Sequence, residues 1–239
     1  MTNSHEISPN SNFIGAEKMI SAAYADPRAL SRQFRLKRFE KITEMIDRII
    51  AQKGSCKIAD IGGTKYYWDI VEDFVATRPV EITLINPKDA QKSSGKFSYL
   101  NGDATDLSSL DDDSFDFVHS NSVIEHVGDW ENRVAMAREV ARLAPTYYVQ
   151  TPYFWFPYEP HFRSLFFHWL PEQIRYRLVM RFALGFADRK KTIHDAMVRV
   201  QSARLLDRGQ MRALFPEATL TAERVFGFTK SLTAIRQAD

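Results

Sequence analysis

The stretch KIADIGGTKYYWD, residues 57–69, decides the fold. Apolar residues lead to Asp60, and Gly62 and Gly63 follow at once. This order is typical of a buried strand that ends in a tight turn beneath a cofactor, because glycine permits positive φ and lets a ligand approach the backbone. A dinucleotide site requires G-x-G-x-x-G and an acidic residue about 20 positions later, and the sequence has neither. The turn therefore indicates a cofactor other than a dinucleotide.

Strands and helices alternate on both sides of this turn. Gly54 ends the first helix, and Pro87 ends the second strand. Strands are expected at 57–61, 81–86, 97–103, 115–120 and 146–151, and helices at 28–54, 66–77 and 130–143. Such alternation predicts a mostly parallel sheet with helices on both faces. Residues 206–215 are expected to form a helix with Asp207 as its N-cap, and two final strands are expected to meet at Gly227.

The composition excludes several kinds of protein. The chain has 239 residues and one cysteine, Cys56, so neither an internal disulfide nor a cysteine zinc site is expected. The opening MTNSHEISPNSN lacks the features of an export signal, and no run of about 18 apolar residues occurs. We therefore expect a cytoplasmic protein without a membrane span. No basic stripe with interleaved stacking residues predicts a nucleic-acid partner.

Four polar features follow expected strands, at the edge where ligands bind in an open parallel sheet. The first is the segment 60–64, and the second is Asn86, which could hydrogen-bond a ribose or simply form a turn before Pro87. The third is GDA at 102–104, where a carboxylate could accept from an adenine amino group or serve as a turn residue. The fourth is FDFVHSNSVIEHV at 115–127.

In this order and spacing, the motifs DIGG, GDA-x-DL and DDDSFDFVHSNSVIEHV resemble the class I S-adenosylmethionine-dependent methyltransferases, in particular the small-molecule, type 11-like branch. The last motif is the most specific. The resemblance covers residues 56–151 well and 206–236 more loosely. It implies a Rossmann-like sheet of seven strands whose last strand is antiparallel, which agrees with the two strands expected in the tail.

The resemblance also implies a cofactor site for S-adenosylmethionine. It places the first turn at the methionine half, Asn86 at the ribose, GDA at adenine, and the end of the fourth strand near the sulfonium. The implied cofactor-binding residues are Asp60, Gly62, Gly63, Thr64, Asn86, Asp103, Ala104, Ser120 and Asn121. Thr64 and Tyr66 stand where the family commonly has glycine, and Asn86 replaces its usual carboxylate. A non-catalytic binding or assembly subunit with the same fold is therefore the alternative.

An aromatic segment follows the fifth strand. Nine of the seventeen residues from Tyr153 to Trp169 are aromatic, and prolines interrupt them. We expect a cap insertion at about 152–205 within a methyltransferase domain of residues 55–239, preceded by a mobile segment and a helix at 1–54. A hydrophobic plug or a homodimer interface is the alternative use of these aromatic residues.

The expected reaction is methyl transfer to a small-molecule or glycan-type acceptor, most simply at oxygen. Residues 163–212 carry 11 Lys/Arg against 4 Asp/Glu, which would attract an anionic acceptor or only form a solvated surface. A hydroxyl acceptor needs a base, and we expect His161, oriented by Glu159, or else His119. His126 is expected to serve helix packing or capping. No spacing of His, Asp and Glu predicts a metal site.

Overall fold

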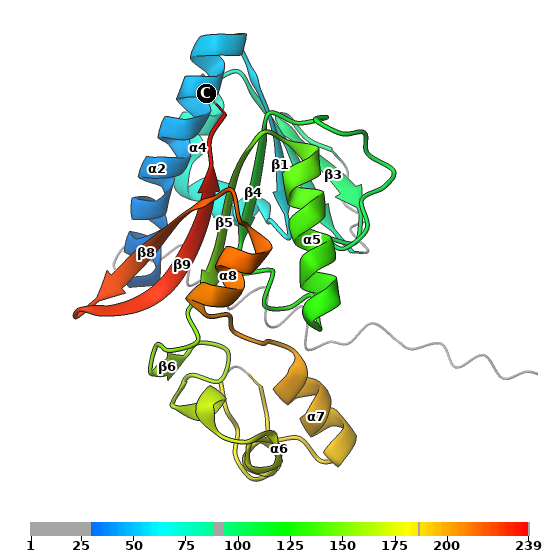
Figure 1. Cartoon of the computed structure of the whole chain (residues 1–239), viewed down its shortest axis with the longest axis vertical. Helices are drawn as coiled ribbons and strands as arrows, with labels where there is room; N and C mark the ends of the chain where they lie inside the picture. Colours follow the sequence, from blue (N-terminus) through cyan, green and yellow to red (C-terminus); the bar gives the residue numbers. More distant parts are fainter. Residues whose placement is uncertain (1–29, 88–92, 186, 239) are drawn as a thin grey trace, which may run out of the picture.

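A computed structural model describes residues 30–87, 93–185 and 187–238, so the expectation of a mobile segment at the N-terminus lies outside the described residues. Its centre is a seven-stranded sheet of order β3-β2-β1-β4-β5-β9-β8 (Figure 1). The strands are β1 (Cys56–Ile61), β2 (Val80–Asn86), β3 (Phe97–Asn101), β4 (Phe117–Asn121), β5 (Thr146–Pro152), β8 (Thr219–Val225) and β9 (Phe228–Arg236). All of the strands expected from the sequence are present.

The first five strands are parallel, and β9 pairs antiparallel with β5. This arrangement confirms the predicted Rossmann-like sheet with an antiparallel last strand. The strand order reverses between β1 and β4, because β2 and β3 lie on one side of β1 and β5 lies on the other side of β4. A ligand in such a sheet binds beyond the carboxyl ends of these two strands.

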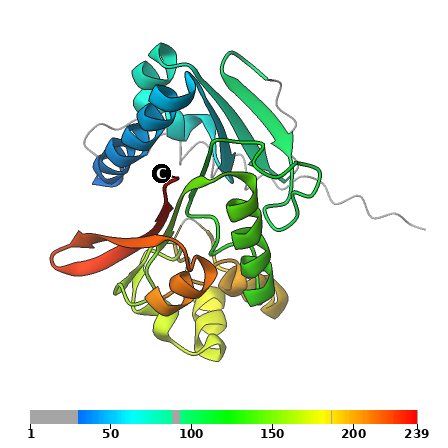
Figure 2. The same cartoon turned by 45° about the horizontal axis from the view of Figure 1, so that its top comes forward.

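Helices cover both faces of the sheet (Figure 2). One face carries α2 (Leu30–Lys53), which buries Ile42, Met45, Ile46 and Ile49 at helical spacing. The other face carries α5 (Trp130–Leu143) and α8 (Arg208–Leu214). The apolar side chains therefore divide into two clusters, one on each face of the sheet.

Two local predictions have different outcomes. Asp207 is the N-cap of α8 and forms a capping box with Gln210, as the sequence predicts. The helix expected at 66–77 is instead divided into α3 (Lys65–Trp68), the 3-10 helix η1 (Asp69–Val71) and α4 (Glu72–Thr77). The break lies at Val71, whose φ of −125° and ψ of 39° are outside the helical region.

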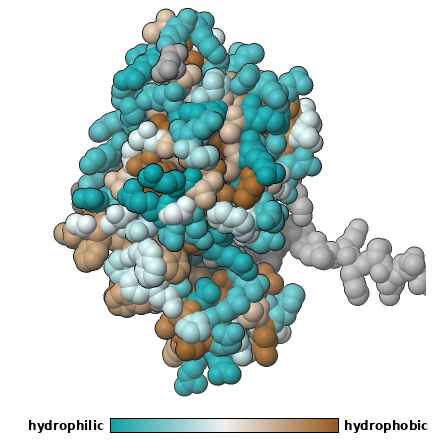
Figure 3. Space-filling view, viewed as in Figure 1, coloured by the Kyte–Doolittle hydropathy of each residue, from teal (hydrophilic) through white to brown (hydrophobic). Residues whose placement is uncertain are grey.

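The chain between β5 and α8, residues 153–206, is called the cap segment below. It contains β6 (Tyr158–Glu159), β7 (Ser164–Leu165), the 3-10 helix η2 (Phe167–Trp169), α6 (Glu172–Arg181) and α7 (Ile193–Gln201). It has an apolar cluster of its own and lies beyond the carboxyl ends of the parallel strands (Figure 1). Figure 3 shows hydrophobic residues exposed among hydrophilic ones over this part of the molecule. Within the described ranges, no helix is long and apolar enough to cross a membrane.

Candidate functional site

The turn after β1 is packed tightly against the chain itself. Gly62 has a φ of 72°, and a Cβ atom there would lie 2.4 Å from a methyl group of Val123. A Cβ atom on Gly63 would lie 1.8 Å from the carboxylate of Asp60. Both glycines are therefore required by internal packing, and the next residue, Thr64, is exposed at the start of α3.

The carboxylate of Asp60, a residue predicted to bind the cofactor, is directed into the interior. Its side chain is completely buried. Trp68 Nε1 donates to Oδ2 over 2.7 Å, and His119 Nδ1 lies 2.6 Å from Oδ1. A buried carboxylate needs such partners to replace water. Asp60 therefore organises the interior beneath the turn.

His119, the second residue predicted as a base, lies in the interior. Its ring is buried between the rings of Tyr67 and Tyr148, with centroid distances of 5.1 and 6.0 Å. A general base must reach the proton that it removes. With Nδ1 held by Asp60 and the ring enclosed by aromatic residues, His119 contacts no open space.

Ser120, which together with Asn121 is predicted to lie near the sulfonium, is also internal. It is fully buried, and its hydroxyl donates to the carbonyl of Ile61 over 3.1 Å. This contact links the ends of β4 and β1. Asn86 makes a similar link, because its Nδ2 donates to the carbonyl of Gly63 over 2.8 Å. The amide side chain therefore positions the glycine turn from the end of β2.

The GDA segment lies open at the end of β3. Asp103 is exposed, and its Oδ1 accepts from Thr105 N over 2.9 Å and from Thr105 Oγ1 over 2.7 Å. These bonds fix the carboxylate without burying it. Ala104 is half-buried against the apolar cluster that contains Leu107. The pair offers an exposed carboxylate beside apolar surface.

A cavity of about 240 Å³ lies at the ends of β4 and β5. Polar groups of Asn121, Ser122 and Gln150 line it on the sheet side. Ser122 has a φ of 58°, a left-handed conformation that non-glycine residues adopt mainly in special turns. The remaining lining residues come from α2, the end of β5, the cap segment and β9: Phe34, Arg35, Arg38, Pro152, Tyr153, Phe156, Tyr158, Pro160, Lys230 and Ser231.

Arg38 is the residue of this cavity that sequence reasoning missed. Its Nη1 donates to Asn121 Oδ1 over 2.9 Å and to Gln150 Oε1 over 3.3 Å. Its Nε and Nη2 form a two-pronged ion pair with Glu223. The sequence presents Arg38 as one of many charged residues in a helix, and only the packing of α2 over the strand ends reveals these contacts.

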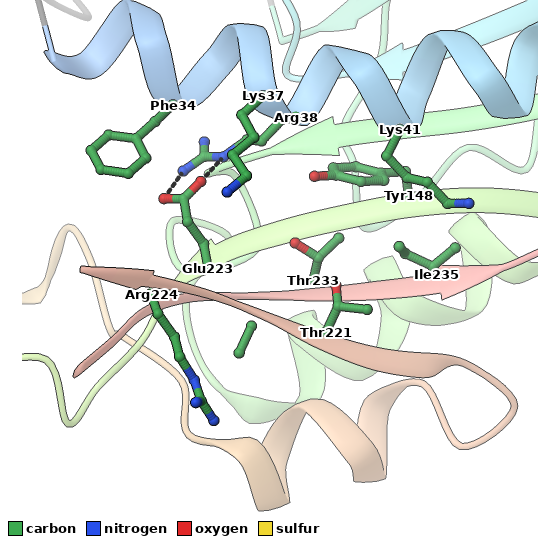
Figure 4. A pocket seen from close by; sticks show the side chains of 11 residues that line it. Phe34, Lys37, Arg38, Lys41, Tyr148, Thr221, Glu223, Arg224, Thr233 and Ile235 are labelled. Carbon is green, nitrogen blue, oxygen red and sulfur yellow. Dashed lines mark hydrogen bonds and ion pairs between the residues drawn. The ribbon is translucent and has the colours of Figure 1, made fainter. Parts of the chain in front are cut away.

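A second cavity of about 380 Å³ lies between α2 and the β8–β9 hairpin (Figure 4). Arg38 lines both cavities, and its ion pair with Glu223 is visible in the figure. Burial alone would raise the pKa of the Glu223 carboxyl, but hydrogen bonds and attraction to Arg38 and Lys230 lower that pKa below its ordinary 4.5. Burial lowers the pKa of the Lys230 ammonium. Basic groups therefore surround a single carboxylate here.

The predicted base His161 lies in the cap segment, between β6 and β7. Its Nδ1 is 2.7 Å from Glu159 Oε1, so the expected partner is present. Its Nε2, however, lies 3.1 Å from Nε2 of His126. His126 Nδ1 lies 2.7 Å from the carbonyl of Ser202, the C-cap residue of α7, which agrees with the predicted capping role, and its Nε2 faces this second imidazole. His161 therefore has no free ring nitrogen directed at the 240 Å³ cavity.

Comparison with known proteins agrees with this geometry. Residues 60–145 match the family model described as a methyltransferase domain. With the observed strand order, this match defines a class I methyltransferase domain. Residues 60–145 are accordingly similar to the methyltransferase domains of S-adenosylmethionine-dependent enzymes. A search of curated proteins found no match.

Three solved structures match this chain at low identity. A putative zinc-dependent alcohol dehydrogenase from Rhodobacter sphaeroides is 14% identical, with a TM-score of 0.49, over 77% of this chain and 84% of that one. A SAM-dependent methyltransferase from Methanosarcina mazei is 16% identical, with a TM-score of 0.44, over 77% and 92%. An O-methyltransferase family protein from Burkholderia thailandensis is 12% identical, with a TM-score of 0.47, over 95% and 68%. At these values the similarities do not bear on the substrate.

The residues present fit the adenosine part of S-adenosylmethionine. Asp103 offers an exposed carboxylate, and carboxylates accept hydrogen bonds from amino groups such as that of adenine. Asn86 stands at the end of β2, two strands from Asn121 at the end of β4. The three side chains therefore follow neighbouring strands along one edge, with the glycine turn between them.

Proposed function

We propose that this chain transfers the methyl group of S-adenosylmethionine to an oxygen atom of a small anionic acceptor, such as a sugar acid. The observation that carries this proposal is the 240 Å³ cavity at the ends of β4 and β5. Arg35, Arg38 and Lys230 line it. A cavity with an excess of basic groups favours a negatively charged ligand.

The cofactor is proposed to lie across the carboxyl ends of β1, β2 and β4. Gly62, Gly63 and Thr64 would contact its methionine half, Asn86 its ribose, and Asp103 with Ala104 its adenine. Asn121 would lie nearest to the sulfonium, because it also lines the cavity. S-adenosylmethionine supplies an electrophilic methyl group on a positively charged sulfur. The chain supplies alignment and exclusion of water.

The acceptor is proposed to be small. Ligand cavities commonly measure about 300–1,000 Å³, so a volume of about 240 Å³ suits one compact molecule. Aromatic residues from α2 and the cap segment line the side away from the sheet: Phe34, Tyr153, Phe156 and Tyr158. Such rings suit the apolar face of a sugar, and the basic residues suit its acid group.

An acceptor that is already ionised is also consistent with the positions of His119 and His161. His119 is enclosed, and His161 Nε2 faces His126, so neither is placed as a free base. A carboxylate oxygen carries no proton at neutral pH and needs no base before it attacks a methyl group. We therefore propose methyl esterification in preference to methylation of a neutral hydroxyl.

The proposal is tested in two steps. Calorimetry should show binding of S-adenosylmethionine and S-adenosylhomocysteine, with NAD as the negative control. Methyl-labelled cofactor is then incubated with uronic acids and with the matching neutral sugars. Label should enter the acids alone, and mild base should release it as methanol, because esters hydrolyse where ethers do not. Cofactor binding with label only in neutral sugars would reject the anionic acceptor, and absence of cofactor binding by the folded protein would favour the non-catalytic alternative.

A further inference from the structure

Three side chains that could bind a metal meet where the cap segment contacts the sheet. Glu125 and His126 follow β4, and His161 lies between β6 and β7. One ligand atom from each lies within 4.8 Å of the others. The sequence predicts no metal site because 34 residues separate His126 from His161, and only the fold brings them together.

The hydrogen bonds of the two imidazoles direct two lone pairs at each other. His126 Nδ1 lies 2.7 Å from the carbonyl of Ser202, and His161 Nδ1 lies 2.7 Å from the carboxylate of Glu159. Both oxygens can only accept, so each Nδ1 carries the ring proton. Each Nε2 then offers a lone pair unless it binds a second proton, and the two atoms are 3.1 Å apart. Such a pair is stable only with a cation between the nitrogens, either a proton or a metal ion.

Glu125 contributes an independent indication. Its side chain is almost completely buried, and its Oε2 accepts from Thr151 Oγ1 over 2.9 Å. Its Oε1 is buried and has no hydrogen-bond partner among the residues that the structure describes. A buried carboxylate oxygen without a partner is costly, and coordination to a cation would remove that cost.

The neighbouring arginines do not serve as that partner. Attraction of Arg133 to Glu125 and of Arg199 to Glu159 opposes the burial that lowers the pKa of each guanidinium. Within the described part of the chain, Arg133 nevertheless donates to the carbonyl of Arg204, and Arg199 donates to the carbonyl of His161 and the hydroxyl of Ser202. The carboxylate of Glu125 therefore remains available to a cation.

The histidines are held in the manner of metal ligands. Metal-binding histidines usually donate their second ring N–H to a carboxylate or a backbone carbonyl, which are the two partners found here. The backbone at His161 is also fixed, because Arg199 donates to its carbonyl over 2.7 Å and a Cβ atom on Gly185 would lie 2.3 Å from that oxygen. The donors are thus positioned without a ligand.

We propose that Glu125, His126 and His161 bind one divalent transition-metal ion of the zinc type. Bond lengths of about 2.0–2.1 Å in a tetrahedral site separate two nitrogens by about 3.3–3.4 Å, close to the observed 3.1 Å between the two Nε2 atoms. Two imidazoles and a carboxylate suit Zn²⁺ better than Mg²⁺ or Ca²⁺, which prefer oxygen ligands. His126 is exposed, so a fourth position is open to water. The ion joins the cap segment to the loop after β4, and this assignment does not depend on the methyl acceptor.

The test is calorimetry of the untagged, chelator-treated full chain with Zn²⁺. The wild-type protein should bind one ion per chain with a Kd below about 10 µM, and Co²⁺ in its place should give the visible absorption of a tetrahedral complex. His126→Gln and His161→Gln should each weaken Zn²⁺ binding by about 100-fold or more. This effect is larger than that expected when a residue that only hydrogen-bonds a metal ligand is removed. Glu159→Gln, which changes only such a group, should weaken binding by about 10-fold to 100-fold.

His194→Gln is the matched control, because His194 is an exposed histidine of α7 outside the cluster. Its Zn²⁺ affinity should equal that of the wild type. Circular dichroism establishes that each variant is folded, and His126→Gln changes an exposed side chain. Stoichiometric binding lost in both cluster variants and kept in His194→Gln supports the site. Failure of the wild type to bind Zn²⁺, or binding by His126→Gln and His161→Gln with the affinity of the wild type, overturns it and leaves a shared proton between the imidazoles.

Discussion

The molecule contains two carboxylate–histidine pairs of similar geometry and different surroundings. Asp60 and His119 are 2.6 Å apart, and Glu159 and His161 are 2.7 Å apart. The first pair is enclosed by aromatic rings, and Trp68 Nε1 donates a hydrogen bond to Asp60. The second lies at the junction of the cap segment, where the His161 side chain is 18% exposed and faces another imidazole. The pair alone therefore does not define a function, because access decides whether its free nitrogen can meet a ligand.

The largest difference between the pairs is expected in stability. Asp60→Ala strands both Trp68 Nε1 and His119 Nδ1 in the interior, and each stranded group costs about 1–3 kcal/mol, so we expect a loss of about 3 kcal/mol or more. Glu159→Gln keeps an acceptor oxygen for its neighbours and should cost about 1 kcal/mol. Urea unfolding measures both free energies. An equal loss in the two variants would erase the distinction between an interior pair and a ligand-binding pair.

Trp68, the other partner of Asp60, provides a second test of the difference between the two carboxylate–histidine pairs. Trp68→Phe removes the indole donor to Asp60 and some buried volume, and it should lower the free energy of unfolding by about 1–3 kcal/mol. Tyr66→Phe is the neighbouring control, since Tyr66 is 53% exposed, and a change of about 0.5 kcal/mol or less is expected. Similar values for the two variants would show that Asp60 does not depend on Trp68.

Asp103 extends the comparison to an exposed carboxylate. If it accepts from adenine, Asp103→Ala should weaken binding of S-adenosylmethionine by about 1–3 kcal/mol, the usual cost of an unpaired polar group, with unfolding little changed. Calorimetry measures the affinity. Asp106→Ala, in the same turn, is the control and should leave binding unchanged. Unaltered affinity in Asp103→Ala would remove Asp103 from the cofactor site.

The sequence predicts the strands of the sheet, but it does not predict which carboxylates and histidines are enclosed in the interior. Alternating apolar runs and turn residues predict every strand from β1 to β5, and Asp207 and Gly227 predict the elements of the tail, because such signals are local. The orientation of Asp60 toward the interior depends on Trp68, eight residues later, and on His119, on another strand. The contact between His126 and His161 likewise depends on how the cap segment folds back. Contacts between distant segments leave no periodic pattern in a single sequence.

The smallest effect concerns a third carboxylate, Glu223, which is paired with cations instead of histidine. Arg38 and Lys230 lower the pKa of its carboxyl against the opposing effect of burial. A carboxyl whose folded pKa is lowered stabilises the protein above its unfolded pKa, near 4.5, and loses this contribution as the pH falls through the folded value. Urea unfolding at several pH values should therefore show a smaller loss of stability below pH 4.5 for Glu223→Gln than for the wild type. Parallel curves would assign the acid sensitivity to other carboxylates, and a steeper curve in the variant would contradict the lowered pKa, because removing a group that loses stabilisation in acid can only flatten the profile.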